Sequence, residues 1–173
     1  FDAQPTLKGA LLELTPLTAE DFEGLAKAAS DPKIWAMHPA KTRHERAVFI
    51  PYFGWLLTSN SALVIKDKQG QICGCSRYYT APDMPDTVSI GFTFLTREHW
   101  GGPANAQIKS LMLNHAFRSE SEVWLHIDPA NLRSQKATEK LGATHIYTAD
   151  LDLGTGLAPF MCYKIDAPPL LLA

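Results

Sequence analysis

The chain passes from an apolar strand pattern to an amphipathic helix pattern at Trp100-Gly101-Gly102-Pro103-Ala104-Asn105. A glycine pair at a strand-to-helix turn leaves backbone N–H groups uncovered and pointing outward. The N-terminus of the following helix adds roughly half a positive charge. Because both features favour phosphate or another anion, this segment predicts an anion-binding site.

The residues on either side of this turn predict strands and helices in a mixed order. The predicted strands are 11–17, 62–67, 72–80, 87–96, 123–128, 144–150 and 160–165, and the predicted helices are 18–30, 43–59, 104–119 and 132–141. This order predicts a single α/β (α+β) domain over residues 1–173, with helices flanking a mixed central sheet.

Local signals refine the predicted helix ends. Thr18 and Asp21 are typical of a capping box at the start of the first helix. Pro51 predicts a kink or break inside the second helix, because proline lacks a backbone N–H. Gly142 suits the position that follows the end of the last helix.

The bulk composition is that of an ordinary soluble protein. Of 173 residues, 46% are apolar and 20% charged, and the net charge is -2. This balance gives no reason to expect nucleic acid or a membrane surface as a partner. Without a recognisable signal peptide and with only three cysteines, the chain is expected in the cytoplasm with reduced thiols.

Several site types have no support in the sequence. The six histidines are dispersed, and Cys73-Gly74-Cys75 lacks the spacing of a zinc site, so no metal site is expected. There is no Gly-x-Ser-x-Gly elbow and no Gly-Lys-Ser/Thr after the glycines, which argues against a serine hydrolase and a nucleotide-binding P-loop. The glycines also come too late in the chain for a dinucleotide-binding fold.

Two segments resemble the GCN5-related N-acetyltransferase (GNAT) family. The first is Ile90-Gly91-Phe92-Thr93-Phe94-Leu95 with the later His99–Asn105, which is similar to the family's fourth strand and acetyl-CoA pyrophosphate loop. The second runs from Asn131-Leu132-Arg133-Ser134 to Gly142-Ala143, which is similar to the family's helix beside coenzyme A. The Trp-Gly and Asn-x-x-Ser pairs point to the branch that acetylates the N-termini of ribosomal proteins.

The resemblance covers nearly the whole chain and implies a fold, a cofactor and a set of residues. The implied fold has a mixed, mostly antiparallel central sheet flanked by helices, and the implied cofactor is acetyl-CoA. The residues that the resemblance assigns to acetyl-CoA are Phe94, Leu95, Thr96, Trp100, Gly101, Gly102, Ala104, Asn105, Ala106, Asn131 and Ser134.

The sequence departs from the family pattern at two positions. Pro103 stands where the loop motif has a glycine, so one potential phosphate donor is missing. Ser89 stands where relatives often carry a carboxylate base. Other candidates for the base are Asp83, Asp86, Glu98, His99 and His38, each of which is also typical of a solvated loop residue.

Acetyl transfer to an amine needs a polarised thioester carbonyl, a neutral amine and a protonated leaving thiolate. The resemblance implies a strand bulge near Phe92–Thr96 that frees backbone groups for the first task. Gly91 either permits that distortion or only relieves crowding. Ser134 is the expected donor to the thiolate, and its alternative is a plain helix-start serine. Asn131 is expected to cap the helix and to contact coenzyme A.

The acceptor pocket is expected between the first two helices and along the third predicted strand. The residues placed there are Trp35, His38, Tyr78 and Tyr79, although aromatic residues at this spacing also suit core packing. The prediction is an acetyl-CoA-dependent transferase acting on a primary amine, either a protein N-terminus or a small molecule. The alternative is a catalytically silent acyl-CoA-binding or interaction module. A homodimer through sheet edges near the C-terminus is also consistent with the pattern.

Overall fold

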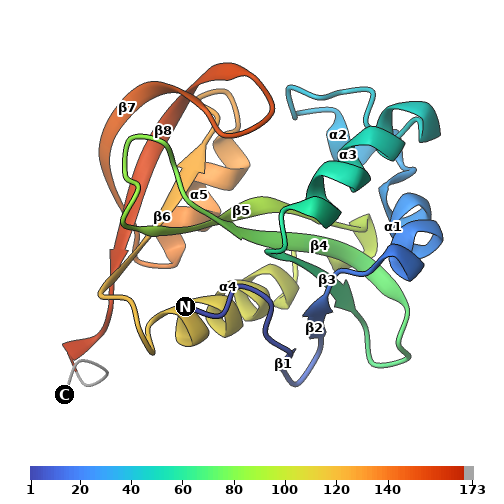
Figure 1. Ribbon diagram of the computed structural model, residues 1–173, viewed down its shortest axis with the longest axis horizontal. Helices are drawn as coiled ribbons and strands as arrows, with labels where there is room; N and C mark the ends of the chain where they lie inside the picture. Colours follow the sequence, from blue (N-terminus) through green and yellow to red (C-terminus); the bar gives the residue numbers. More distant parts are fainter. Residues whose placement is uncertain (170–173) are drawn as a thin grey trace. The chain divides into compact units, whose positions relative to one another are not determined.

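The computed structural model describes residues 1–169 and contains an eight-stranded sheet with helices (Figure 1). The strands are β1 (Leu7–Lys8), β2 (Glu13–Pro16), β3 (Ala62–Lys66), β4 (Ile72–Tyr79), β5 (Val88–Leu95), β6 (Glu122–Ile127), β7 (Thr144–Asp152) and β8 (Leu157–Asp166). The α-helices are α1 (Phe22–Ala29), α2 (Pro32–Trp35), α3 (Arg46–Thr58), α4 (Ala104–Ala116) and α5 (Leu132–Lys140), and the 3-10 turns are η1 (Ala19–Asp21) and η2 (Arg97–His99).

The strand order is β1-β2-β3-β4-β5-β6-β8-β7. The β5–β6 pair is parallel, whereas β1–β2, β2–β3, β3–β4, β6–β8 and β7–β8 are antiparallel. The sequence-based expectation of a mixed, mostly antiparallel sheet with helices is therefore confirmed. No helix of residues 1–169 is both long and apolar enough to cross a membrane.

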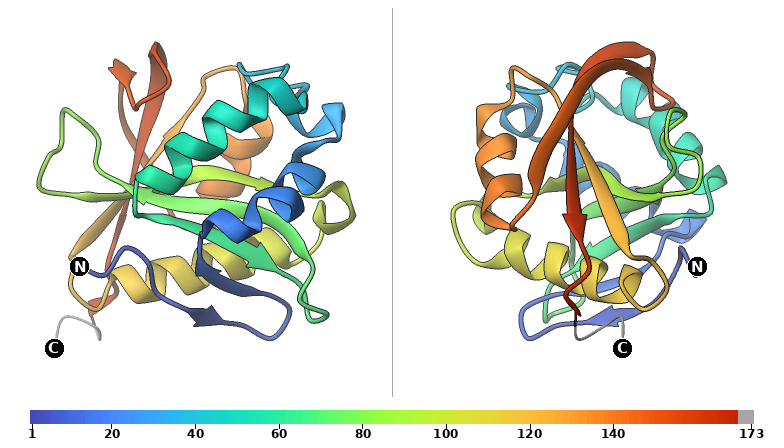
Figure 2. Two further views of the ribbon diagram at one scale, coloured as in Figure 1. Left: turned by 45° about the vertical axis from the view of Figure 1, so that its right-hand side comes forward. Right: turned by 90° about the vertical axis from the view of Figure 1, so that its left-hand side faces the viewer.

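The chain forms two compact units. The N-terminal unit contains residues 2–77 and 92–111, and the C-terminal unit contains residue 1, residues 78–91 and the chain from 112 onward. Within the N-terminal unit, α1, α2 and α3 lie on one face of the strands and the start of α4 lies on the other (Figure 2). The expectation of one domain over 1–173 stays a prediction.

The helices of the N-terminal unit form where apolar spacing and caps coincide. The carboxylate of Asp21 accepts a 2.8 Å hydrogen bond from the Thr18 amide at the predicted first cap, and α1 buries Leu25, Ala28 and Ala29. These side chains join a core with residues of α3 and β3, including Phe49, Phe53, Leu56, Ala62 and Val64. Burial of these side chains holds α1 and α3 against the sheet.

Two local features differ from the sequence-based expectation. Of the kink or break predicted at Pro51, the break does not occur, because α3 continues through Pro51 and buries Phe49, Tyr52, Phe53 and Leu56 on either side. That packing compensates for the single backbone hydrogen bond that proline removes. The short helix α2 was not expected; Asp31 caps it by accepting from the Lys33 amide at 3.0 Å, with Pro32 as the first helical residue.

The C-terminal unit is built on β6, which pairs with β8 along its whole length. Strands β7 and β8 form a long hairpin that extends beyond the predicted 144–150 and 160–165. Helix α5 lies against β6 and ends as predicted at Gly142, whose φ of 91° is in the left-handed region. Trp124, Leu151 and Cys162 form a small core beneath the hairpin.

Lys109 of α4 is the most unusual buried residue of the N-terminal unit. It is 8% exposed, and its Nζ donates a 2.7 Å hydrogen bond to Thr93 Oγ1, which lies 2.8 Å from Ser76 Oγ. Burial lowers the pKa of the Lys109 ammonium to about 8. The charged form is therefore disfavoured in the folded protein.

Replacing Lys109 with Met is expected to stabilise the fold at pH 7. The lowering of the pKa from 10.5 to about 8 corresponds to a cost of about 3 kcal/mol, which an apolar side chain of similar length avoids. Because the pKa is lower in the folded chain, the unfolded chain binds more protons between pH 8 and 10.5, and wild-type stability should rise with pH over that window. Urea unfolding from pH 7 to 10 measures the free energy of unfolding of both proteins. The Lys109→Met variant should be more stable than wild type at pH 7, and the difference should become small by pH 10. A variant that is less stable than wild type at every pH would contradict this explanation.

Candidate functional site

The predicted anion loop is open and exposes backbone donors. Gly101 has a φ of 71°, a backbone conformation that residues other than glycine rarely adopt. A Cβ added at Gly101 or at Gly102 would meet no atom within 4 Å, so the space around both residues is open. The amide of Gln107 is the first in α4 to bond within the helix, donating to Pro103 O at 3.0 Å. The amides of Ala104, Asn105 and Ala106 therefore point out of the helix end without a partner in the described chain.

Pro103 leaves this set of donors intact. Its carbonyl starts the hydrogen-bond ladder of α4, so it occupies the N-cap position and Ala104 is the first helical residue. The N–H that proline lacks lies outside the first helical turn. The expected departure from the family loop therefore removes one donor and keeps the three at the helix end.

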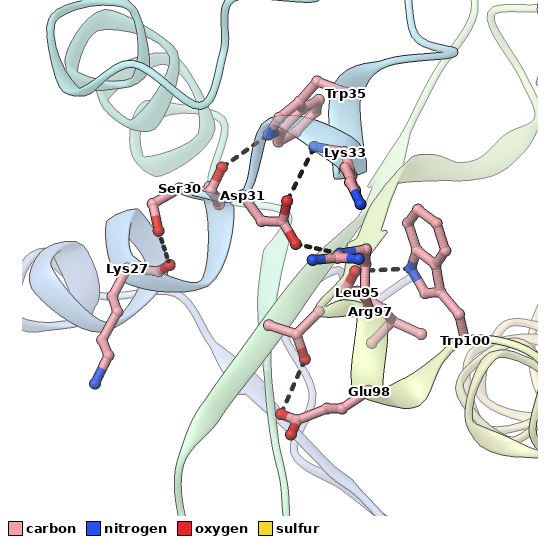
Figure 3. Close-up of polar contacts among 11 residues, drawn as sticks. Lys27, Ser30, Asp31, Lys33, Trp35, Leu95, Arg97, Glu98 and Trp100 are labelled. Atoms are coloured by element: carbon pink, nitrogen blue, oxygen red, sulfur yellow. Dashed lines mark hydrogen bonds and ion pairs between the residues drawn. The ribbon is translucent and has the colours of Figure 1, made fainter.

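The turn that leads into the loop is anchored by side chains (Figure 3). Trp100 donates from Nε1 to Leu95 O at 2.9 Å and packs against the core of this unit. Arg97 forms an ion pair with Asp31, the residue that caps α2. The hydrogen bonds from Arg97 and from the Lys33 amide lower the pKa of Asp31. These contacts hold residues 96–100 in place ahead of the free amides.

Near the strand bulge that the resemblance implies, β5 has one residue with an unusual backbone conformation. Phe92 has a φ of 53°, which is left-handed and rare for a bulky residue. Phe94 and Leu95 are buried, the amide of Thr96 donates to Cys73 O at 2.8 Å, and Leu95 O is taken by Trp100. The strand is irregular at Phe92, and these two backbone groups at its C-terminal end are already used within the protein.

In the C-terminal unit, Gly91 lies under an aromatic ring. A Cβ at Gly91 would lie 2.9 Å from Tyr79 Cε1, and its φ is not in the left-handed region. Of the two explanations of this glycine, relief of crowding is the one that the contacts support. The parallel ladder between β5 and β6 covers only Val88–Val123 and Ser89–Trp124, although β6 continues to Ile127.

Asn131 and Ser134 also belong to the C-terminal unit. Asn131 caps α5, with its side-chain oxygen accepting from the Ser134 amide at 3.1 Å. The expected capping role of Asn131 is present. Ser134 is half-buried in the first turn, and its hydroxyl has no partner among the described residues. That hydroxyl is available to a ligand.

Tyr79 and His126 form a pair that the sequence did not reveal. The Tyr79 hydroxyl lies 2.6 Å from His126 Nδ1, while His126 Nε2 is buried and has no hydrogen-bond partner within residues 1–169. Burial lowers the pKa of His126 to about 4, against a smaller raising effect of Asp83. The imidazole is therefore neutral at pH 7. No sequence motif predicts this pair, because 47 positions separate the two residues. Tyr79 lies at the end of β4 and His126 in β6, so the folding of the sheet brings them together.

The other candidate bases are poorly placed for that role. Ser89 is fully buried with its Oγ unpartnered. Asp83 is exposed and accepts a hydrogen bond from Tyr147, and Asp86 is exposed. Glu98 and His99 lie 3.8 Å apart on the surface of η2. The described chain therefore presents no carboxylate in a buried, base-like environment among these positions.

The four predicted acceptor residues do not form one group: Trp35 and His38 belong to the N-terminal unit, and Tyr78 and Tyr79 point to opposite faces of β4 in the C-terminal unit. Trp35 is 3% exposed and donates to Ala29 O at 2.8 Å, with the ring of His38 packed edge-on at 5.4 Å. Tyr78 is 1% exposed, and its hydroxyl donates to Met112 O at 2.8 Å. Adjacent strand residues point to opposite faces, so Tyr78 serves the core beside α4 and Tyr79 faces away from it.

Other kinds of site find no support in the described structure. No group of three or more His, Cys, Asp or Glu within residues 1–169 is placed to hold a metal ion. A shallow hollow on the N-terminal unit is lined by Glu23, Lys27 and Arg46 among others. It contains none of the predicted site residues.

Comparison with known proteins agrees with this fold. Residues 12–144 match the model of a family described as the acetyltransferase (GNAT) domain. A GCN5-related N-acetyltransferase from Brucella melitensis superposes with a TM-score of 0.80 at 16% identity, covering 94% of this chain and 79% of that one. An acetyltransferase of the GNAT family from Bacillus anthracis gives 0.70 at 14% identity, covering 94% and 98%.

A third similar structure contains a derivative of coenzyme A. Mycobacterium smegmatis RimJ in complex with CoA-disulfide superposes with a TM-score of 0.71 at 15% identity, covering 94% of this chain and 88% of that one. No curated protein matches the chain significantly. At these identities the solved structures establish the fold.

Proposed function

The chain belongs to the acetyltransferase (GNAT) family, and from that premise we propose that it transfers an acetyl group from acetyl-CoA to a primary amine. The observation that carries the proposal is the set of unpartnered amides at Ala104, Asn105 and Ala106 beside the open Gly101-Gly102 turn. Such an arrangement fits a pyrophosphate, because it supplies several N–H donors and the positive end of a helix. The RimJ structure with CoA-disulfide supports a coenzyme A ligand for this fold.

Acetyl-CoA supplies the activated acetyl group, and the protein residues have separate tasks. We assign its pyrophosphate to residues 101–106 and its pantetheine arm to the irregular β5 strand around Phe92–Thr96. In the reaction the amine nitrogen bonds to the thioester carbon, the C–S bond breaks, and the amine loses one proton. The half-buried Ser134 hydroxyl is assigned to donate a hydrogen bond to the leaving sulfur.

The proton of the amine goes to water in this proposal. A side chain with a pKa near 4, such as His126, is too weak a base to take a proton from an ammonium group at neutral pH. The Tyr79 hydroxyl, 2.6 Å from His126 Nδ1, instead holds the neutral ring in place. The amine is therefore expected to react from its neutral fraction, and the rate to rise with pH up to the pKa of the amine.

The acceptor is a polypeptide N-terminus or a small molecule, and the expected compartment is the cytoplasm, consistent with three free cysteines. Of the four residues predicted for the acceptor, the half-buried His38 remains a proposed contact, while Trp35, Tyr78 and Tyr79 are buried. A homodimer stays a prediction.

The experiment that tests the proposed function is release of the coenzyme A thiol in the presence of a panel of amines. The panel includes amino acids, their decarboxylated amines, polyamines and short peptides. Release that depends on an amine, with the acetylated product identified by mass spectrometry, supports the transferase. Tight acetyl-CoA binding without acetylation of any amine would favour the catalytically silent module instead.

Replacing Ser134 with Ala is expected to lower kcat by about 10- to 100-fold while leaving acetyl-CoA affinity nearly unchanged. The reason is that the hydroxyl has no structural partner in the described chain and acts only as charge develops on sulfur. Steady-state kinetics with calorimetry measures both quantities. The matched control is Ser119→Ala, which changes a surface serine outside the proposed site and should leave kcat unchanged. A Ser134→Ala variant with the kcat of wild type would show that the Ser134 hydroxyl has no role in the reaction.

A further inference from the structure

Arg43 is a buried cation without an anionic partner among residues 1–169. It lies in the turn before α3 and is 7% exposed. The ion pairs nearest to it in sequence join Arg46 to Glu23 and Arg97 to Asp31, and no described carboxylate pairs with Arg43. Burying an unpaired charge is unfavourable unless another group compensates for the lost hydration. Some other group must therefore offset the hydration that the Arg43 guanidinium loses on burial.

Two aromatic rings compensate in part. The guanidinium carbon of Arg43 lies 3.7 Å from the ring centroid of Tyr52 and 5.2 Å from that of Trp35. Stacking of this kind uses the flat faces of the guanidinium, whereas its five N–H donors point outward in the plane. None of those donors has an acceptor in the described chain, and their nitrogens are not sealed from solvent. The edges of the group are therefore open to a ligand.

The neighbouring ionisable groups do not neutralise Arg43. Burial raises the pKa of Cys75 to about 12 and raises the pKa of Tyr52 well above its ordinary value. The thiol and the phenol are therefore neutral at pH 7. No described anionic side chain of the N-terminal unit therefore neutralises the positive charge of Arg43.

A single aromatic ring, that of Trp35, separates Arg43 from the β5 segment assigned to the pantetheine arm of acetyl-CoA. The Trp35 ring, which contacts Arg43, also packs against Phe94 with centroids 5.1 Å apart. All three residues belong to the N-terminal unit. A group bound at Arg43 therefore lies near the proposed site of acetyl transfer.

We propose that Arg43 binds a carboxylate of the acceptor, so that the acceptor is an amine that carries a carboxylate close to its nitrogen. A carboxylate matches the two parallel N–H bonds that a guanidinium edge offers. The inference rests on the proposed acetyl transfer and narrows its acceptor class. The same chemistry has two sources, a free amino acid or the acidic side chain at a polypeptide N-terminus.

Matched acceptor pairs test the preference and its source. The pairs are L-phenylalanine with phenethylamine, L-leucine with isopentylamine, and peptides that begin with Asp or with Asn. With kcat/KM expressed per concentration of neutral amine, the carboxylate member of at least one pair should exceed its partner by about tenfold or more, because Arg43 would form a charge-assisted bidentate contact with it. Preference within the first two pairs indicates a free amino acid, and preference only within the peptides indicates an acidic N-terminus. Equal kcat/KM within every pair overturns the proposal.

Substitutions separate a binding role from a structural one. Arg43→Gln should remove the preference through KM, with acetyl-CoA affinity and the KM of phenethylamine unchanged. Arg46→Gln, which alters an exposed arginine at the start of α3, three positions after Arg43, should keep the preference. If Arg43→Gln does not fold, Arg43→Lys keeps the charge but loses the fork and should weaken the preference in part.

A binding measurement without acetyl-CoA keeps the two proposals distinguishable. Titration of protein labelled with ¹⁵N-arginine by sodium propionate should shift the Arg43 Nε–H resonance, whereas propanamide should not. A saturable shift without any acetyl transfer would leave the carboxylate site standing and remove the proposed function. Acetyl transfer without a propionate shift at Arg43 would remove the carboxylate site alone.

Discussion

Replacing Gly74 with Ala is expected to lower the free energy of unfolding by about 3 kcal/mol or more. A Cβ at Gly74 would lie 2.0 Å from Phe94 O, 3.0 Å from Phe94 C and 3.2 Å from Leu95 Cα. All three are backbone atoms of β5, so no side chain can rotate away. Relief requires β4 and β5 to separate beside the hydrogen bond from Thr96 N to Cys73 O.

Thermal unfolding measures this effect, and Gly54→Ala is the matched control. For a chain of this size the Gly74→Ala variant should melt about 10 °C below wild type. Gly54 lies within α3 with no atom within 4 Å of a Cβ, so the same substitution there should stabilise by about 0.5–1 kcal/mol. A Gly74→Ala variant as stable as wild type would contradict the close approach of β4 and β5.

Replacing Ala106 with Glu is expected to weaken acetyl-CoA binding by at least about tenfold while leaving the fold intact. Ala106 is exposed in the first turn of α4, beside the amides proposed to hold the pyrophosphate. A carboxylate there repels a bound phosphate. The same carboxylate favours the helix N-terminus by about 0.3–1 kcal/mol, so loss of binding would not reflect unfolding.

The control for this prediction is Ala106→Gln, which has the same size and no charge and should bind acetyl-CoA nearly as wild type. Asn105→Asp, a half-buried position in the same turn, should behave like the Glu variant. The neighbouring Ala104 is buried, so a charge there would test the core instead. Calorimetry at two salt concentrations measures the affinities; equal affinity of the Glu and Gln variants would place the anion elsewhere.

The fold was predictable where the spacing of apolar residues agreed with the turn and cap residues at the ends of the elements. The strand-turn-helix at residues 87–116 and the end of α5 at Gly142 follow from glycine positions and apolar spacing. The continuation of α3 through Pro51 was not predictable in this way, because tertiary burial of Phe49, Tyr52 and Phe53 outweighed the local penalty. The two-residue strand β1 and the four-residue helix α2 are too short to give a periodic signal.

The open turn before α4 was likewise predictable from its glycines, whereas two side-chain pairs elsewhere in the chain were not. Tyr79 and His126, or Arg43 and Tyr52, come from separate elements, and no spacing rule joins them. The net charge of -2 gave no sign of Arg43, a buried cation without an anionic partner among the described residues.

The central claim is that acetyl-CoA is held through its pyrophosphate at residues 101–106. Calorimetry of the wild-type protein with acetyl-CoA and with S-acetylpantetheine, which lacks the pyrophosphate, tests it most directly. The account predicts micromolar binding of acetyl-CoA and binding of S-acetylpantetheine that is weaker by at least about tenfold. Equal affinity for the two compounds, or no binding of acetyl-CoA by the folded protein, would contradict it.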